Sequence, residues 1–287
     1  MKYLGVDTGG TFTDFVYFDG EALKVHKVLS TPHAPEEAIL NGIAEMGITL
    51  DDVQVIHGST VATNAVLEGK GVRTAYITNR GLGDILTIGR QARQSLYELE
   101  PATVTPPVPE SLCLETGGRL AADGSEVETL TGTDLCQLKT RLQELAPDAV
   151  AINLLFSFLD DRFERAIEAV VPGDVFCSRS SSILPEVREY ERGITTWLNA
   201  YVGPLMENYI LRLQKGLGQA GPSVMQSHGG TISARQAAHH AVRLLLSGPA
   251  GGLQGARYVG AQAGIDRLLT FDMGGTSTDV ALIDGDI

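Results

Sequence analysis

Two short segments of the sequence share a pattern of aspartates, glycines and threonines that could bind a phosphorylated ligand. Residues 7–14 are Asp-Thr-Gly-Gly-Thr-Phe-Thr-Asp, and residues 272–279 are Asp-Met-Gly-Gly-Thr-Ser-Thr-Asp. Six of the eight positions are identical in the same register, which is far more than chance predicts. Two ordinary hairpins would explain the glycines. They would not explain why an aspartate precedes each glycine pair and why threonines follow it.

The chemistry of this repeat is that of a phosphate clamp. Glycine allows backbone N–H groups to converge on an anion, and threonine hydroxyls add further donors. The aspartates would repel phosphate unless a divalent cation lay between them, and Mg²⁺ with retained waters is the usual ion. The pattern therefore predicts a site for a magnesium-bound nucleotide. No Gly-x-x-x-x-Gly-Lys follows, which excludes a P-loop, and the strand that comes next excludes a dinucleotide-binding fingerprint.

Both repeats lie between apolar segments that are typical of paired strands. Residues 3–6 and 15–18 flank the first repeat, and residues 268–271 and 280–283 flank the second. Each second segment ends at an Asp-Gly pair, which is a strong signal for a tight turn. Each repeat therefore predicts a strand, a glycine-rich loop, a second strand and a turn.

A second polar patch follows the next apolar strand and contains His57, Ser59, Thr60 and Asn64. Ligands of open α/β sheets bind beyond the carboxyl ends of the strands, so His57 and Thr60 are further candidate catalytic residues. Ser59 or Thr60 could instead serve only as the cap of the helix that follows. Farther along, Arg90 and Arg93 could bind a carboxylate or phosphate in bidentate geometry, or could form a solvated surface pair.

The remaining pattern alternates strands and helices, which predicts an α/β fold. Amphipathic helices are expected over residues 35–46 and 133–145, where apolar side chains recur on one face. A long helix is expected over 186–217, with Gly203-Pro204 as a potential break. Strands are expected over 149–155 and 242–246, each delimited by turn residues.

Composition places the chain among ordinary globular proteins. With 287 residues it can bury a sizeable core, and its formal net charge of −13 argues against broad binding to nucleic acid or to anionic membranes. It has no secretory signal pattern and no run of 18 apolar residues. Three widely spaced cysteines, Cys113, Cys136 and Cys177, favour reduced thiols and a cytoplasmic location. No Cys/His cluster indicates zinc.

The repeats and five further motifs resemble the hydantoinase/5-oxoprolinase family, in its hydantoinase A, N-methylhydantoinase-like branch. The motifs extend over nearly the whole chain in the family's order. The further motifs are 57–65 (His-Gly-Ser-Thr-Val-Ala-Thr-Asn-Ala), 88–91 (Ile-Gly-Arg-Gln), 184–192 (Leu-Pro-Glu-Val-Arg-Glu-Tyr-Glu-Arg), 198–202 (Leu-Asn-Ala-Tyr-Val) and 246–252 (Leu-Ser-Gly-Pro-Ala-Gly-Gly).

The order of elements also resembles the superfold of actin, hexokinase and the heat-shock chaperone ATPases. This implies an α/β, actin-like (ribonuclease H-like) ATPase fold, present as the first lobe plus the first hairpin of the second lobe. The resemblance implies an N-terminal hydantoinase/oxoprolinase region over residues 1–182 with the first phosphate hairpin. Residues 183–287 would start the hydantoinase A region, with a crossing helix and the second phosphate hairpin.

The resemblance assigns roles to the repeated residues, with ATP and Mg²⁺ as cofactors. Asp7 and Asp272 would position Mg²⁺ or the attacking group, and so act as both metal-binding and catalytic residues. Four further residues of each repeat would bind the ATP phosphates from the two sides of a cleft. They are Gly9, Gly10, Thr11 and Thr13 in the first repeat, and Gly274, Gly275, Thr276 and Thr278 in the second.

The implied activity is ATP-dependent opening of a cyclic amide such as a hydantoin, an N-methylhydantoin or 5-oxoproline. Phosphoryl transfer to the amide oxygen would create a good leaving group and let water cleave the C–N bond. One alternative is a subunit of an ATP-dependent ketone carboxylase. Another, of a different class, is an ATPase that drives conformational change without small-molecule chemistry.

The family resemblance also implies a longer protein, because the adenine-binding region lies farther along in the superfold. We therefore expect this chain to be an N-terminal fragment that has little or no activity alone. A partner subunit of the hydantoinase B type and an oligomeric full-length form are further expectations.

Overall fold

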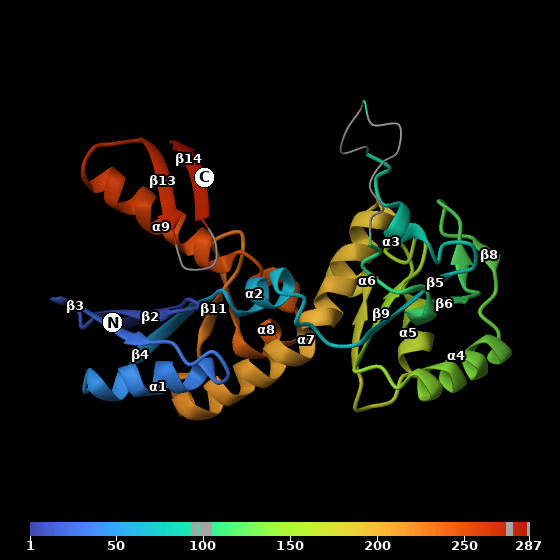
Figure 1. Ribbon diagram of the computed structural model, residues 1–287, viewed down its shortest axis with the longest axis horizontal. Helices are drawn as coiled ribbons and strands as arrows, with labels where there is room; N and C mark the ends of the chain where they lie inside the picture. The colour runs from blue at the N-terminus through green and yellow to red at the C-terminus, as the bar shows by residue number, and fades with distance from the viewer. Residues whose placement is uncertain (93–96, 98–104, 274–277, 286–287) are drawn as a thin grey trace. The chain divides into compact units, whose positions relative to one another are not determined.

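The structure is a computed structural model that describes residues 1–92, 97, 105–273 and 278–285 (Figure 1). The chain divides into two compact units. Unit 1 combines Met1–Lys70 with Leu205–Ile287, and unit 2 is Gly71–Pro204. No helix within the described ranges is both long and apolar enough to cross a bilayer.

Unit 1 is built on a six-stranded mixed sheet with the order β12-β11-β4-β1-β2-β3. Strands β1, β4 and β11 are parallel, whereas β2 and β3 continue antiparallel from β1, and β12 pairs antiparallel with β11. The first repeat forms the β1–β2 hairpin, as its sequence predicts. The strands are β1 (Lys2–Thr8), β2 (Phe12–Phe18), β3 (Leu23–Leu29), β4 (Val53–Ser59), β11 (Ser223–Met225) and β12 (Thr231–Ser233).

The two faces of this sheet differ because successive side chains of a strand point to opposite sides. Leu4, Val6 and Phe15 are buried on the face where α1 (Pro35–Glu45) packs. The C-terminal part of α7 (Glu189–Leu217) lies on the same side, next to α1 (Figure 1). Arg212 of α7 forms an ion pair with Glu36 of α1. The other face carries the alternate residues, including the aspartates of the first repeat.

The second repeat forms a separate two-stranded antiparallel sheet in unit 1, from β13 (Arg267–Met273) and β14 (Thr278–Asp284). Helix α9 (Ser247–Gln262) precedes this hairpin and packs against both of its strands and against β4. The hairpin that the sequence predicts is therefore confirmed. The shorter elements of unit 1 are α2 (Val61–Leu67), η2 (Gly218–Ala220), α8 (Ala234–His239) and η3 (Ala241–Leu244).

Two predictions about local structure were wrong. Residues 242–246 do not form a strand; Ala241–Leu244 is a 3₁₀ turn instead, with Ala241 and Leu244, three apart, buried together. Helix α7 is not broken at Gly203-Pro204. A Cβ atom at Gly203 would lie 2.3 Å from the Phe176 ring, so this glycine provides close packing against the neighbouring strand and does not end the helix.

Unit 2 contains a four-stranded parallel sheet with the order β10-β9-β5-β6. The two central strands are buried on both faces, which explains their continuous apolar sequences. One face packs on α4 (Gly132–Leu145) and α5 (Arg162–Glu168), and the other packs on α3 (Ile85–Ile88) and the first part of α7. The strands are β5 (Thr74–Asn79), β6 (Cys113–Thr116), β9 (Ala149–Asn153) and β10 (Phe176–Arg179).

The remaining elements of unit 2 are short. A small hairpin lies between β6 and α4. The hairpin consists of β7 (Arg119–Leu120) and β8 (Glu126–Glu128). The other short elements of unit 2 are η1 (Glu110–Leu112) and α6 (Ser180–Ile183).

Candidate functional site

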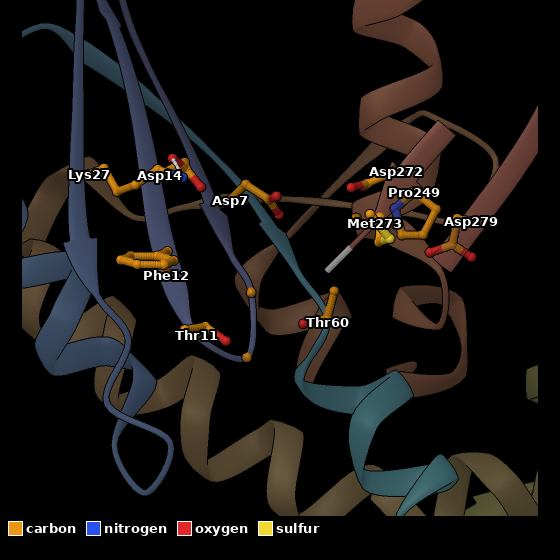
Figure 2. A pocket seen from close by; sticks show the side chains of 13 residues that line it. Asp7, Thr11, Phe12, Asp14, Lys27, Thr60, Pro249, Asp272, Met273 and Asp279 are labelled. Atoms are coloured by element: carbon orange, nitrogen blue, oxygen red, sulfur yellow. Dashed lines mark ion pairs between the residues drawn. The ribbon is translucent and has the colours of Figure 1, made fainter. Parts of the chain in front are cut away.

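The first repeat lines a cavity of about 490 Å³ that lies within unit 1 (Figure 2). Residues of the β1–β2 loop contribute one side, β13 and β14 contribute another, and the starts of α2 and α9 complete it. The lining residues are Asp7, Gly9, Gly10, Thr11, Phe12, Asp14, Lys27, Thr60, Gly248, Pro249, Asp272, Met273 and Asp279.

The aspartates of the site occur as two cross-strand pairs. Asp7 of β1 lies opposite Asp14 of β2, and Asp272 of β13 lies opposite Asp279 of β14. Side chains directly opposite on an antiparallel pair are close neighbours, and like charges there are unfavourable. Each copy of the repeat therefore presents two adjacent carboxylates to the same cavity.

Electrostatics make the cavity strongly acidic. Desolvation around the carboxyl of Asp7 raises its pKa above the ordinary value of 3.8, and the negative charges of Asp14 and Asp272 raise that pKa further. Lys27 of β3 pairs with Asp14 at 2.8 Å and is the one basic residue in the described lining. Its ammonium also lies 4.9 Å from the centre of the Phe12 ring. One lysine does not balance four carboxylates.

The first glycine-rich loop has a defined conformation. The Gly9 N–H donates to the carbonyl of Phe12 at 3.0 Å, and the hydroxyl of Ser30 donates to the carbonyl of Gly9 at 2.8 Å. A Cβ atom at Gly9 would lie 3.2 Å from the Phe12 carbonyl oxygen, so the tight turn requires glycine. Gly10 and Thr11 form the tip of the loop and remain exposed to a ligand.

Small residues leave room for the carboxylate of Asp7. Gly58 lies beside Asp7 on β4, and Gly248 lies at the start of α9. A Cβ atom at Gly58 would lie 3.3 Å from Asp7 Oδ1, and one at Gly248 would lie 3.7 Å from the same atom and 3.1 Å from Thr60 Cγ2. The glycines of the 57–65 and 246–252 motifs thus shape the wall around Asp7.

The structure brings together six of the predicted site residues, namely Asp7, Gly9, Gly10, Thr11, Thr60 and Asp272. Thr60 donates its hydroxyl to the Thr8 carbonyl at 3.1 Å, which joins the start of α2 to the end of β1. Thr278 lies on β14, exposed and outside the described lining. Gly274, Gly275 and Thr276 lie outside the described residues, as does Arg93.

Thr13 and His57 lie on the buried face of the sheet and do not line the cavity. Thr13 is fully buried, and its hydroxyl lies 2.9 Å from that of Ser30. The reason is the two-residue period of the strands: Thr13 follows the exposed Phe12 and precedes Asp14, both of which face the cavity. The prediction that Thr13 binds phosphate placed it on the wrong face for a side-chain contact.

His57 belongs to strand β4 and does not follow it, because the strand extends to Ser59. Its ring is completely buried, with Nε2 2.6 Å from the Tyr209 hydroxyl and Nδ1 3.3 Å from the Val6 carbonyl oxygen. A carbonyl only accepts, so Nδ1 carries the proton and Nε2 accepts from Tyr209. Burial lowers the pKa of His57 to about 4, which keeps the ring neutral. This arrangement fits a packing role between β1, β4 and α7.

The donor set fits a magnesium ion that is held largely by water and phosphate. Mg²⁺ is commonly bound by one or two carboxylates together with substrate phosphates. Among the described residues, no group of three or more His, Cys, Asp or Glu side chains is arranged to hold an ion alone. The paired aspartates instead give the cavity an excess of negative charge that a bound cation would neutralise; after desolvation, this charge is the second cause that raises the pKa of Asp7.

Of the lining residues that were not singled out as site residues from the sequence, three are charged, namely Asp14, Lys27 and Asp279. Asp14 and Asp279 close the repeated motif, and the alternation of a strand could have placed them on the same face as Asp7 and Asp272. Lys27 could not have been found in this way, because its position depends on the register between β2 and β3, where it lies opposite Asp14.

Residues 3–172 match the family described as hydantoinase/oxoprolinase N-terminal region, and residues 192–287 match the one described as hydantoinase/oxoprolinase. Caprolactamase subunit alpha of Pseudomonas jessenii is 35% identical to 98% of this chain, over 43% of its own length. The 5-oxoprolinase 1 of Arabidopsis thaliana is 33% identical to 98% of this chain, over 25% of its own length.

The fold also matches a solved structure over nearly its whole length. The nucleotide-free structure of acetone carboxylase superposes with a TM-score of 0.89 at 28% identity, covering 99% of this chain and 44% of that one. The chain thus spans less than half the length of these relatives. These matches confirm the actin-like ATPase fold that the motifs imply, and the chain belongs to the hydantoinase/oxoprolinase family.

Proposed function

We propose that this chain provides the phosphate-binding part of an ATP-dependent enzyme that opens a cyclic amide. The observation that carries the proposal is a cavity lined by a glycine-rich loop and by two cross-strand pairs of aspartates. The pairs are Asp7 with Asp14 and Asp272 with Asp279. Two carboxylate pairs beside the exposed loop tip at Gly10 and Thr11 are suited to a magnesium-bound polyphosphate and would repel an uncomplexed anion. The names of the relatives, ATP-dependent caprolactamase and 5-oxoprolinase, support cyclic amides as substrates.

In this proposal, each group of the site has a defined task. The exposed tip of the loop at Gly10 and Thr11 binds phosphate oxygens, and Lys27 contributes a positive charge close to them. Asp7 and Asp272 hold Mg²⁺, which supplies charge neutralisation when it is bound. Phosphoryl transfer depends mainly on positioning and on electrostatic stabilisation, so the chain's contribution is a preorganised cleft.

Thr60 and His57 support this site from the sheet. Thr60 is a third predicted catalytic residue that lines the cavity, besides Asp7 and Asp272, and its hydrogen bond to the Thr8 carbonyl fixes the end of β1 next to Asp7. His57 lies behind the sheet, and we assign to it the positioning of β1 and β4 in place of a chemical step. Gly274, Gly275, Thr276 and Thr278 remain proposed phosphate ligands through the second loop and its flank.

The test measures, by calorimetry, the binding of a non-hydrolysable ATP analogue to this chain in the presence and absence of Mg²⁺. We expect saturable binding that requires Mg²⁺ and that is lost in Asp7→Asn. A matched control is Asp51→Asn, which removes one carboxylate from an exposed turn of the same unit. Tight binding without Mg²⁺, or unchanged binding in Asp7→Asn, would contradict the proposal.

The relative named acetone carboxylase beta subunit supports a second candidate, ATP-dependent ketone carboxylation. ATP hydrolysis that depends on bicarbonate and a ketone would favour it, and hydrolysis that depends on a cyclic amide would favour the first. Hydrolysis stimulated only by a folded protein would favour a conformational ATPase. Several relatives are named as subunits, so a partner of the hydantoinase B type is part of this proposal.

A further inference from the structure

The first turn of α2 contacts the supports of both repeats. Thr60 begins this helix and lines the cavity beside Asp7 (Figure 2). Thr63 follows one turn later and is hydrogen-bonded to Leu246, the residue that precedes α9. Residues one turn apart on a helix lie side by side. The 57–65 motif therefore reaches the first repeat through Thr60 and the helix that carries the second repeat through Thr63.

The hydroxyl of Thr60 is bonded to the first repeat and does not cap its own helix. The sequence allowed a capping role, but the Thr60 side chain makes no capping bond to α2. Its hydroxyl donates to the Thr8 carbonyl at 3.1 Å and accepts from the side-chain amide of Asn64 at 3.3 Å. Because an amide N–H can only donate, Asn64 directs the hydroxyl proton of Thr60 toward β1.

Two hydrogen bonds attach the start of α9 to the same region. The Leu246 N–H donates to the Thr63 hydroxyl oxygen at 2.9 Å. The Ser247 hydroxyl donates to the Ser59 carbonyl at 3.1 Å, and both serines are buried. The 57–65 and 246–252 motifs are therefore joined directly, through side chains that do not line the phosphate cavity.

Leu246 has a backbone conformation that needs this support. Its φ of 61° and ψ of 20° are left-handed, which is uncommon for leucine. The side chain is 54% exposed, so burial of this side chain contributes little to holding the conformation. The N–H is held by Thr63, and the carbonyl accepts from the Ala250 N–H at 3.1 Å. Conformations of this kind persist where neighbouring groups hold them, and they concentrate at functional sites.

Helix α9 and the second repeat are packed closely against each other. A Cβ atom at Gly260 would lie 2.6 Å from Leu268 Cδ1 and 2.9 Å from the Ile265 carbonyl oxygen. The turn between helix and strand is tight, because Gly264 has a φ of 72° and the Ile265 N–H donates to the Gly260 carbonyl at 2.9 Å. The position of the first turn of α9 therefore determines where Asp272 lies.

We propose that Thr63, supported by Ser247, is a positioning residue that sets the spacing between the two pairs of aspartates. The first turn of α2 acts as a spacer, in which Thr60 holds the end of β1 and Thr63 holds the start of α9. Neither Thr63 nor Ser247 contacts the ligand. This inference rests on the proposed function, in which both pairs face one magnesium-bound polyphosphate. Reactions of that ligand depend mainly on positioning, so an error in this spacing weakens the site.

The spacing can be measured without nucleotide, by pulsed electron paramagnetic resonance between two spin labels. Suitable positions are Val25 of β3 and Leu282 of β14, which are 78% and 73% exposed. Labels on non-natural amino acids leave the native cysteines unchanged. We expect one narrow distribution of distances when Thr63 and Ser247 are intact. Thr63→Val keeps the shape of the side chain but removes the acceptor, so it should broaden the distribution, as should Ser247→Ala.

The conservative variant Thr63→Ser retains the hydroxyl and should keep the distribution narrow. Thr140→Val removes a threonine hydroxyl from an exposed position of α4 in unit 2 and is the matched control. The melting temperature should change little in Thr63→Val, because the lost hydrogen bond lies at an exposed position where water can replace it.

Calorimetry with the magnesium-bound, non-hydrolysable ATP analogue gives the second readout. The affinity should fall about fivefold in Thr63→Val, as the loss of one positioning hydrogen bond predicts. Thr63→Ser and Thr140→Val should bind the analogue as the unmodified chain does. A residue that only stabilised the fold would lower the melting temperature without changing the spacing or the affinity of the folded protein.

The inference is overturned if Thr63→Val keeps the narrow distribution, whatever happens to its melting temperature. It is also overturned if Thr63→Ser or Thr140→Val broadens the distribution as much, or if a broadened distribution leaves the affinity for the analogue unchanged. Failure of the unmodified chain to bind the magnesium-bound analogue, with the distribution narrow in that chain and broad in Thr63→Val, would count against the proposed function alone.

Discussion

Asp7 and Asp14 lie directly opposite each other on β1 and β2, with both carboxylates on the face of the sheet that the helices α1 and α7 leave open. Asp272 and Asp279 repeat this relationship on β13 and β14. A folded chain that places like charges in register loses stability unless a ligand compensates for it.

Asp7→Asn should stabilise the chain at neutral pH while it abolishes magnesium-dependent nucleotide binding. The pKa of Asp7 is raised above 3.8, so the folded state binds this proton more tightly than the unfolded state does. Stability from this group is therefore lost as pH rises from 3.8 through the folded pKa, and the loss persists at pH 7. Melting temperatures in metal-free buffer should be higher for the variant at pH 7 and equal to wild type well below pH 3.8.

His57→Gln should weaken the dependence of stability on pH in mildly acidic solution. The pKa of His57 falls from 6.5 to about 4 on folding, so its stabilising contribution is complete above pH 6.5 and is lost as pH falls toward 4. A shift of this size corresponds to about 3 kcal/mol. Urea unfolding at several pH values measures the slope. The control is Val55→Ala, at a buried position of the same strand that carries no titratable group; it should lower stability without changing the slope.

Tyr209→Phe should destabilise unit 1 at neutral pH. It removes the hydroxyl that donates to His57 Nε2 at 2.6 Å and leaves that nitrogen buried without a partner. Such a loss costs about 1–3 kcal/mol. Tyr3→Phe, at an exposed strand position, should cost much less in the same urea titration. Equal effects of the two substitutions would argue against the buried pair.

Gly58→Ala should weaken magnesium-nucleotide binding with little loss of stability. The added Cβ would lie 3.3 Å from Asp7 Oδ1, so the carboxylate must move by a few tenths of an ångström. We expect affinity to fall by roughly threefold to tenfold, or about 1 kcal/mol. Gly252→Ala is the control, because a Cβ atom there meets nothing within 4 Å. A binding constant that is unchanged in Gly58→Ala would show that the position of Asp7 is not critical.

Glu164→Ala should strongly destabilise unit 2. The carboxylate is fully buried and accepts hydrogen bonds from Leu154 N, Ser181 N and the Ser180 hydroxyl at 2.6–3.0 Å. Its charge also compensates the buried Arg192, and breaking such an arrangement costs about 3–5 kcal/mol. Glu168→Ala removes a partly exposed partner of Arg179 and should cost under about 1 kcal/mol. Denaturant midpoints for both variants decide between these expectations.

The local sequence pattern predicted the two hairpins of the fold, because each repeat carries its own strand, loop and turn signals. The hairpins at Asp7–Asp14 and Asp272–Asp279 need little tertiary information, so the sequence sufficed for them. Residues 242–246 are different. They are as apolar as a buried strand, but tertiary packing makes Ala241–Leu244 a 3₁₀ turn, and short apolar runs do not separate these outcomes.

The site was predicted only in part, because local spacing identifies some of its residues and long-range strand pairing places the others. The motif identified Asp7, Gly9, Gly10 and Asp272, whose roles depend on residue type and local spacing. The motif alone did not show which face of the strand each side chain occupies, and so the prediction included Thr13. Lys27 lies outside the motif and was omitted. Lys27 enters the site through the pairing of β2 with β3, which is a long-range relationship that spacing in one motif cannot express.

The two-sided character of β1 has a consequence for genetics. Leu4, Val6 and Thr8 are buried, whereas Tyr3 and Asp7 are exposed. Random mutagenesis of this heptapeptide should therefore yield two phenotypic classes that alternate along the codons. Substitutions at codons 4, 6 and 8 should give temperature-sensitive alleles with low protein abundance, and those at Asp7 should give abundant protein that does not complement.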